Sequence, residues 1–392
     1  MRKGWEYKKL GEVCTLISDG SHNPPKGIDH SLYRMISSQN VFDDNLQITE
    51  DNVRYITESD HLCENKRTKL QKDVVLLTIV GTIGRSCVLK GNEGCLTLQR
   101  SVAALHPSDQ IMPRYLMHCL IGNRHTLNQE AHGIAQKGIY LKQLSSLSIP
   151  LPPKSTQLAI VSELDKINEL IRLKKEQLKD FDNLAQSLFY EMFGDPVENE
   201  KGWEAKKLGD VCTDIKYGTS KPASENGRYT YLRMCNLTTD GFLDLSNTKQ
   251  IDIPDDEIEK CIVRYGDILF NRTNSIELVG KTCLFDKKEP MVIAGYIIRV
   301  RLNDTLLPVV LSRMFNLASI KKLLRSMAKG AVNQANINSK ELASIRIPLP
   351  PLSLQRLFAQ RIEQIEREKS EVQKSIQDFE TLLASRIQYW FE

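Results

Sequence analysis

A short proline-rich motif that occurs twice constrains this chain more than any other feature. Residues 149–153 and 347–351 both read Ile-Pro-Leu-Pro-Pro, at an offset of 198 residues. The segments that follow, residues 154–193 and 352–391, contain neither proline nor glycine. Proline suits the entry of a helix and disrupts its interior, so each segment is predicted to be one long helix with Ser155 or Ser353 as its N-cap.

Apolar residues recur in both segments at alternating spacings of three and four. This heptad pattern predicts that the two helices pair as a coiled coil, and the alternative is one amphipathic helix packed on each globular part. The predicted seam consists of Leu164, Ile167, Ile171, Leu178, Phe181, Leu188, Ile362, Ile365, Val372, Ile376, Phe379, Leu383 and Trp390. Lys174, Lys369 and Arg386 interrupt the seam, either to fix its register or to meet a partner protein.

The sequence before each helix is also duplicated. Residues 4–20 and 202–218 are identical at 12 of 17 positions, again at an offset of 198. The chain of 392 residues is therefore a tandem repeat, body then helix, twice over. The predicted boundaries are a first body at residues 1–150, a helical segment at 151–195, a second body at 196–349 and a helical segment at 350–392.

The interiors of the two bodies match only in outline, which suggests one scaffold that recognises two different targets. Short β-rich runs are expected at 74–80, 95–105, 262–270 and 291–302, and helices at 113–122 and 308–325. Each body is thus predicted to be an α+β domain, mainly antiparallel. A pseudo-twofold axis relating the repeats would make the second long helix antiparallel to the first.

Composition excludes several classes of protein. The apolar content is 41% without a membrane-spanning run, the N-terminus lacks a signal-peptide core, and the nine cysteines form no Cys-x-x-Cys pair, so a cytoplasmic protein without a metal site is expected. The net charge of +4 is concentrated in the bodies, which permits nucleic-acid binding without requiring it.

No catalytic constellation is shared by the two bodies, since all seven histidines precede residue 151. Asn23-Pro24-Pro25 lacks the aromatic fourth residue of an adenine-holding methyltransferase motif and is followed by Lys26. Gly280-Lys281-Thr282 lacks the upstream glycine of a phosphate-binding loop. We therefore expect no catalytic residues, while a methyltransferase or nuclease with its own active site and a protein-binding scaffold remain the alternatives.

Polar loops rich in Asn, Gln and Arg recur in both bodies. Such side chains pair with adenine and guanine in the major groove, although they are also common in turns. The predicted DNA-contacting residues are Ser21, His22, Lys26, Arg34, Ser38, Gln39, Asn40, Thr82, Arg85, Gln136, Lys137, Lys216, Tyr217, Thr219, Lys221, Arg233, Asn236, Asn271, Arg272, Thr273, Asn274, Lys329, Asn333, Gln334 and Asn336.

These features together resemble the DNA-specificity subunit of type I restriction-modification enzymes. The resemblance rests on the order of the duplicated motifs: Gly-Trp-x-x-Lys-Lys-Leu-Gly at Trp5 and Trp203, then Pro-Leu-Pro-Pro followed by Gln157 or Gln355. The loop from Asp19 to Pro25 also resembles an opening of the first recognition domain in that family, and the second body lacks it.

The resemblance implies a non-catalytic subunit in which each body is a target-recognition domain for one half of a bipartite, asymmetric DNA site. It further implies an antiparallel coiled coil that sets the half-site spacing and docks two modification subunits, which restriction subunits join. S-adenosylmethionine, ATP and magnesium would then be bound by those partners and not by this chain.

The length of the helices bounds the separation of the half-sites. A helix of about 40 residues is about 60 Å long, which corresponds to at most roughly 18 base pairs. An insertion of seven residues after Lys174 is expected to change the preferred gap and to leave both half-sites unchanged.

Overall fold

The computed structural model describes residues 4–131, 137–331 and 334–391. Contacts within the chain divide it into two compact units. Unit 1 comprises residues 1–175 with 374–392, and unit 2 comprises residues 176–373. Each unit therefore contains one body together with one half of each long helix, whereas the predicted boundaries separate bodies from helices.

The two long helices have the bounds that the proline-free segments predict. They are α6 (Lys154–Phe193) and α11 (Leu352–Phe391), each 40 residues long. The first turn of each helix is closed by the carbonyl of the preceding proline, which accepts from Gln157 N in α6 and from Gln355 N in α11. The predicted N-caps are wrong, because Ser155 and Ser353 are the second residues of these helices and are exposed.

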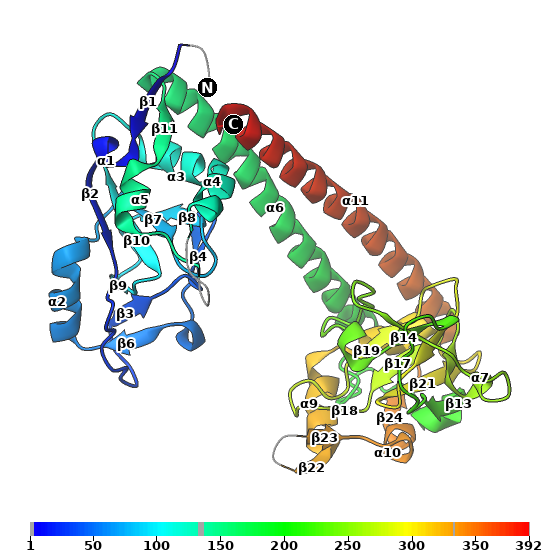
Figure 1. Ribbon diagram of the computed structural model, residues 1–392. Coiled ribbons are helices and arrows are strands. Elements are labelled where there is room, and N and C mark those ends of the chain that lie inside the picture. The colour runs from blue at the N-terminus through cyan, green and yellow to red at the C-terminus, as the bar shows by residue number, and fades with distance from the viewer. Residues whose placement is uncertain (1–3, 132–136, 332–333, 392) are drawn as a thin grey trace. The chain divides into compact units, whose positions relative to one another are not determined.

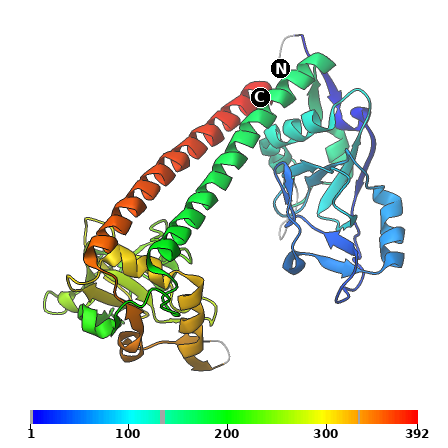
Figure 2. The same ribbon diagram turned by 180° about the vertical axis from the view of Figure 1, so that it is seen from behind.

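Within each unit, the two helical halves pack against each other in antiparallel fashion (Figures 1 and 2). In unit 1, Glu163 pairs with Arg386, and Lys175 Nζ lies 2.8 Å from Glu380. In unit 2, Asp182 pairs with Lys369 at 2.5 Å and Phe189 packs edge-on against Phe358. As the residue number rises in α6 its partner's number falls in α11, which confirms the predicted coiled coil.

The predicted seam is buried or half-buried along its whole length. The buried members are Leu164, Ile167, Ile171, Leu188, Ile362, Ile365, Val372 and Ile376. The half-buried members are Leu178, Phe181, Phe379, Leu383 and Trp390. The seam residues near the helix ends also join the body cores, so the packing of each helix on a body, which was the alternative to a coiled coil, occurs as well.

Two of the charged residues that interrupt the seam have partners within the chain. Lys369 is only 7% exposed, because it pairs with Asp182 and its ammonium lies 4.8 Å from the centre of the Phe242 ring. Arg386 forms a two-pronged contact with Glu163 and lies over the Tyr389 ring. Internal ion pairing therefore accounts for the charge at both positions.

The described part of the body of unit 1 holds two sheets of more than two strands (Figure 1). The antiparallel one has the order β2-β10-β7-β8, and the other, with the order β6-β3-β9, contains the parallel pair β3 and β9. The bounds are β2 (Cys14–Asp19), β10 (Val102–Pro107), β7 (Val75–Thr78), β8 (Ser86–Val88), β6 (Arg54–Ile56), β3 (Tyr33–Ile36) and β9 (Cys95–Leu98). The short pairs β1 (Glu6–Lys9) with β11 (Ser148–Leu151) and β4 (Val41–Phe42) with β5 (Asn45–Leu46) complete the body.

Helices cover these sheets on different sides. The helix α2 packs on β9, whereas α3 packs on β7 and β8 and contacts α6. The helices of the body are α1 (Leu10–Val13), α2 (Glu58–Thr68), α3 (Pro113–Gly122), α4 (Arg124–Gln129) and α5 (Leu141–Ser146). The helix predicted at 113–122 is confirmed, as are strands within the runs 74–80 and 95–105.

The body of unit 2 repeats this plan. The antiparallel sheet has the order β13-β21-β17-β19, the second sheet β15-β14-β20-β16, and a small third sheet β18-β23-β22. Their bounds are β13 (Cys212–Tyr217), β21 (Ile297–Leu302), β17 (Ile268–Asn271), β19 (Thr282–Leu284), β15 (Lys249–Ile251), β14 (Tyr229–Leu232), β20 (Met291–Ile293), β16 (Ile262–Val263), β18 (Thr273–Asn274), β23 (Gln334–Asn336) and β22 (Lys329–Ala331). The strands β12 (Ala205–Lys207) and β24 (Arg346–Pro348) pair in the same way as β1 and β11.

The predicted helix at 308–325 is two helices. They are α8 (Pro308–Phe315) and α9 (Ala318–Met327), and the shorter α7 (Ile258–Cys261) and α10 (Ser339–Ser344) lie elsewhere in the body. The break occurs where Asn316 Nδ2 donates to the carbonyls of Ser312 and Thr282, and where Leu317 adopts extended backbone angles. A side chain that bonds the backbone ends α8 there.

A buried glutamine fixes the start of each long helix to its body. Gln157 is 1% exposed, accepts from Met112 N at 2.9 Å, and donates to the carbonyls of Gln110 and Pro152. Gln355 is fully buried and makes the equivalent three bonds, with Leu307 N, Thr305 O and Pro350 O. One amide thus joins the helix, the proline segment and the loop before α3 or α8.

The first body also holds α6 through ion pairs. Arg114 on α3 bonds Asp165 through two nitrogens and Asp44 through a third contact, and the buried His118 reaches the same Asp165 carboxylate at 2.7 Å. Burial alone would raise the pKa of Asp165, but the bonds from His118 and Arg114 outweigh it and lower the pKa. Asp165 therefore remains an anion beside α3.

We predict that Gln355→Ala destabilises unit 2 by roughly 2 kcal/mol, because Leu307 N–H and the carbonyls of Thr305 and Pro350 lose the amide that bonds them. The measurement is the free energy of unfolding from chemical denaturation, followed by tryptophan fluorescence. Gln360→Ala, at an exposed position of the same helix in unit 2, is the matched control and should change the free energy of unfolding by less than about 0.5 kcal/mol. Equal effects from the two variants would contradict the anchoring role of Gln355.

Candidate nucleic-acid interface

A close backbone crossing builds the same loop edge in both units. A Cβ at Gly20, just after β2, would lie 2.2 Å from the Leu98 carbonyl, and one at Gly218, just after β13, would lie 2.1 Å from Ile293 O. Only glycine permits this approach. The residue after each glycine then donates to that carbonyl, from Ser21 N at 2.7 Å and from Thr219 N at 2.9 Å.

Further backbone bonds bring segments that are distant in sequence to this edge. In unit 1, Ile79 N donates to Ser101 O and Ile139 N donates to Ile79 O. In unit 2, Arg272 N donates to Tyr296 O and Ile337 N donates to Arg272 O, all at 2.9 Å. Four segments in each unit therefore meet at one edge, and many of the predicted DNA-contacting residues lie on them.

The exposure of the predicted residues differs widely. The exposed ones are His22, Lys26, Gln39, Thr82, Lys137, Lys216 and Tyr217, and the half-buried ones are Arg34, Ser38, Arg85, Thr219, Lys221, Arg233, Arg272, Asn274 and Asn336. Gln136 and Asn333 lie outside the described residues, and of Lys329 and Gln334 only the backbone is described, in β22 and β23.

The prediction that Asn40 and Asn236 contact bases is wrong. Both side chains are buried at equivalent turns. Asn40 accepts from Ser37 N and donates to two carbonyls, and Asn236 accepts from Arg233 N and likewise donates to two carbonyls. Each amide has its bonding capacity used within its own loop, so its role is to shape that loop.

Three further predicted contacts are corrected for the same reason. Ser21 is buried and donates to Glu64. Thr273 is buried and donates to Asn336, and Asn271 is fully buried and accepts from Asn274. These side chains organise the edge from inside and cannot reach a ligand.

Several predicted cations are already paired. Arg34 donates to the Glu93 carbonyl, Arg233 to the Asn247 carbonyl, and Lys221 to the Glu257 carboxylate. Lys216 lies 3.4 Å from Asp214, a contact of little strength at an exposed site. A phosphate group would compete for these cations with partners that the protein itself supplies.

The loop from Asp19 to Pro25 in unit 1 is held by α2. Arg67 on α2 donates to the Gly20 carbonyl and lies 3.4 Å from Asp19, whose carboxylate also bonds His22 at 2.6 Å. The imidazole of His22 remains largely exposed beyond this contact. The loop therefore presents His22 and Lys26 from a fixed base.

Sequence reasoning missed two residues at this edge. Arg100 in unit 1 and Tyr296 in unit 2 are exposed and lie on the loop that meets the glycine crossing. The sequence gives no signal for these two residues, because the close approach of Gly20 and Gly218 to distant strands is visible only in three dimensions.

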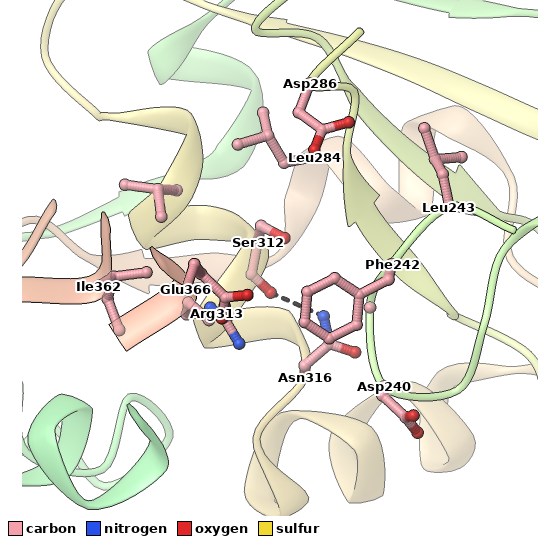
Figure 3. A pocket seen from close by; sticks show the side chains of 12 residues that line it. Asp240, Phe242, Leu243, Leu284, Asp286, Ser312, Arg313, Asn316, Ile362 and Glu366 are labelled. Carbon is pink, nitrogen blue, oxygen red and sulfur yellow. Dashed lines mark hydrogen bonds and ion pairs between the residues drawn. The ribbon is translucent and has the colours of Figure 1, made fainter. Parts of the chain in front are cut away.

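A cavity in unit 2 lies where a body loop meets α11 (Figure 3). It has a volume of about 230 Å³, and Phe242, Arg313 and Glu366 face it. Arg313 Nη2 bonds Glu366 at 2.5 Å, and the Phe242 ring lies beside the guanidinium. These polar groups are paired with each other, so the cavity marks a contact between the body and α11.

The lysine in one of the sequence features that resembled enzyme motifs has a structural role. Lys281 Nζ donates to the carbonyls of Met234 and Leu237, and burial lowers its pKa.

Among the described residues no group of three or more His, Cys, Asp or Glu is arranged to hold a metal ion. No helix in that part of the chain has the length and apolar character needed to cross a membrane.

Comparison with known proteins gives consistent matches over nearly the whole chain. The family described as "Type I restriction modification DNA specificity domain" matches residues 2–180 and again residues 200–378, at the same offset of 198. The chain is 22% identical over 399 residues to the EcoKI specificity subunit of Escherichia coli K12, a match covering 95% of this chain and 84% of that protein.

Solved structures share the fold. A type I restriction-modification S subunit from M. genitalium aligns with a TM-score of 0.53 at 14% identity, over 100% of this chain and 98% of the other. A chain from work on the assembly and conformational transition of a type I restriction-modification system aligns with a TM-score of 0.58 at 19% identity, with the same coverage.

Proposed function

The chain belongs to the type I restriction-modification DNA specificity family, and from that premise we propose how its parts divide the task. Each unit reads one half of a bipartite, asymmetric DNA site, and the paired helices α6 and α11 set the distance between halves. The family provides the specificity subunit and not the catalytic one. S-adenosylmethionine, ATP and magnesium are bound by partner subunits, and the assembly works in the cytoplasm.

The observation that carries this proposal is the repetition of one edge with different side chains. The glycine crossing and the buried glutamine recur in both units, whereas the residues presented at the edge differ, such as His22 and Lys26 against Tyr217 and Arg272. A repeated scaffold that presents different side chains is suited to recognising two different half-sites. An enzyme built by duplication would instead repeat its reactive side chains.

An exposed leucine that is repeated on the two long helices supports two copies of one partner. Leu184 on α6 and Leu382 on α11 are 51% and 43% exposed, and they lie 198 residues apart at equivalent positions of the repeat. A single exposed leucine is ordinary on a protein surface, so the support comes from its repetition at equivalent positions of the two halves. We propose that each binds one modification subunit, and that restriction subunits join the assembled core.

The first test is the methylome of cells that express this chain with the modification subunit encoded beside it. We expect one bipartite motif with a fixed gap and one methylated adenine in each half, mapped by long-read sequencing. Methylation by the purified chain alone would favour the alternative of an enzyme with its own active site. Absence of salt-sensitive binding to duplex DNA would favour a protein-binding scaffold.

The spacing role predicts the effect of lengthening both helices together. Seven residues inserted after Lys174 and seven after Gln373 lengthen the pair by about 10 Å, or about three base pairs, and keep the heptad phase. The methylated motif should keep both halves and gain a longer gap. A changed half-site with an unchanged gap would contradict the proposal.

The docking role predicts a graded loss of partner binding. Leu184→Asp and Leu382→Asp should each remove about one modification subunit per complex, and the double variant should remove both, as measured by native mass spectrometry. Asn183→Asp, at the exposed neighbouring position of α6, adds the same charge and is the matched control. Full occupancy in the double variant would place the partner elsewhere.

A further inference from the structure

One arginine in the second body differs from all the others there. Each of the others donates to an acceptor within the protein, either a carboxylate or a carbonyl; they are Arg228, Arg233, Arg264, Arg299, Arg301, Arg313, Arg325 and Arg346. Arg272 instead lies over an aromatic ring, and no described residue accepts a hydrogen bond from its side chain. Its buried Nε is unpaired, as it is in Arg233 and Arg299, but those two arginines bond through their other nitrogens. Its charge is therefore not neutralised by any described group.

The backbone of Arg272 is nevertheless firmly held. Its N–H donates to Tyr296 O and its carbonyl accepts from Ile337 N, both at 2.9 Å. Thr273, the next residue, bonds Asn336 at 2.9 Å. The arginine thus starts from a fixed point at the loop edge of unit 2.

The side chain is held as well. The guanidinium carbon lies 4.7 Å from the centre of the Tyr217 ring, and the Tyr217 hydroxyl accepts from Ser339 N at 2.8 Å, which fixes the ring. An arginine stacked on an aromatic face loses little further conformational freedom when it binds a planar acceptor pair. Stacking on Tyr217 therefore holds the Arg272 guanidinium in place, where it can donate two hydrogen bonds to one ligand.

The surroundings suit the major groove of DNA. Arg272 immediately precedes β18, which pairs with the two-stranded ribbon of β23 and β22. A two-stranded ribbon is one of the elements that the major groove admits. Tyr296, 53% exposed, flanks the arginine on the neighbouring loop.

We propose that Arg272 reads a guanine in the half-site of unit 2 through its O6 and N7 atoms, with Tyr217 as the residue that positions it. The inference rests on the proposed function and assigns one base to one side chain. Guanine presents two acceptors in the major groove, and a planar arginine fork matches them. A phosphate would equally accept from arginine, but it would carry no sequence information.

The first body cannot use the same device. The residue at the equivalent place in its backbone ladder is Ile79, which is buried and cannot donate from its side chain. Recognition by unit 1 must therefore use other residues of its edge. The assignment to Arg272 concerns only the half-site of unit 2.

The test compares methylomes of Arg272→Ala, Arg272→Lys and the control Arg325→Ala, each expressed with the modification subunit. In both Arg272 variants we expect one G·C position of one half-site to become degenerate, with discrimination there reduced about tenfold to a hundredfold. The other half-site and the gap should be unchanged. Arg325→Ala removes an exposed arginine of the same body and should leave the motif intact.

The alanine variant separates base reading from phosphate binding. If alanine lowers methylation without changing the motif, Arg272 contacts the backbone and the inference is wrong. If lysine restores the motif that alanine loses, the position is still read as a base, because lysine can also donate to guanine. Tyr217→Leu should partly reduce discrimination at the same base position, because the stacked ring is lost. Tyr217→Phe keeps the ring and removes only the hydroxyl that accepts from Ser339 N, so it measures the contribution of that bond. Thermal melting of each variant identifies any loss of methylation caused by unfolding.

The methylome of the wild-type chain tests the proposed function, and the methylomes of the variants test the assignment of Arg272. A wild-type methylome without a bipartite motif would count against the proposed function itself. A clear bipartite motif in the wild type, unchanged in Arg272→Ala and in Arg272→Lys, would leave that function standing and overturn only the assignment of Arg272.

Discussion

A single amide at the start of each long helix holds this architecture together. Gln157 and Gln355 each bond a loop N–H, a loop carbonyl and a proline carbonyl, and each is buried. A long helix has little stability alone and needs tertiary contacts to fix where it points. Because these bonds are directional, they fix the angle at which each helix leaves its body, which apolar contacts alone would not do.

The parts of the structure that follow from local rules could be predicted from the sequence. Proline placement predicted the bounds of α6 and α11, and the heptad spacing predicted a seam that is buried at Leu164 and Ile365. The charge at Lys369 and Arg386 left two explanations open, since a sequence cannot show whether Asp182 or Glu163 lies opposite.

The edge of each body was harder to predict, because a polar loop residue looks the same whether it points inward or outward. Asn40 and Asn236 have the chemistry of base readers and use it on their own turns. Arg100 and Tyr296 gave no signal, because their place depends on a backbone approach between residues far apart in sequence. The repeat in the sequence still identified corresponding positions, since Gly20 and Gly218 make the same close backbone approach in the two units.

The antiparallel pairing of the helices has a consequence for synthesis of the chain on the ribosome. Unit 2 is a continuous stretch that is complete once residue 373 has been made. Unit 1 begins at the N-terminus, yet Trp5 stacks on Trp390, and Phe391 packs against Tyr115 and Gly122. The first body to emerge is thus the second to be completed, and until residues 374–391 arrive it exposes the apolar surface that they later cover.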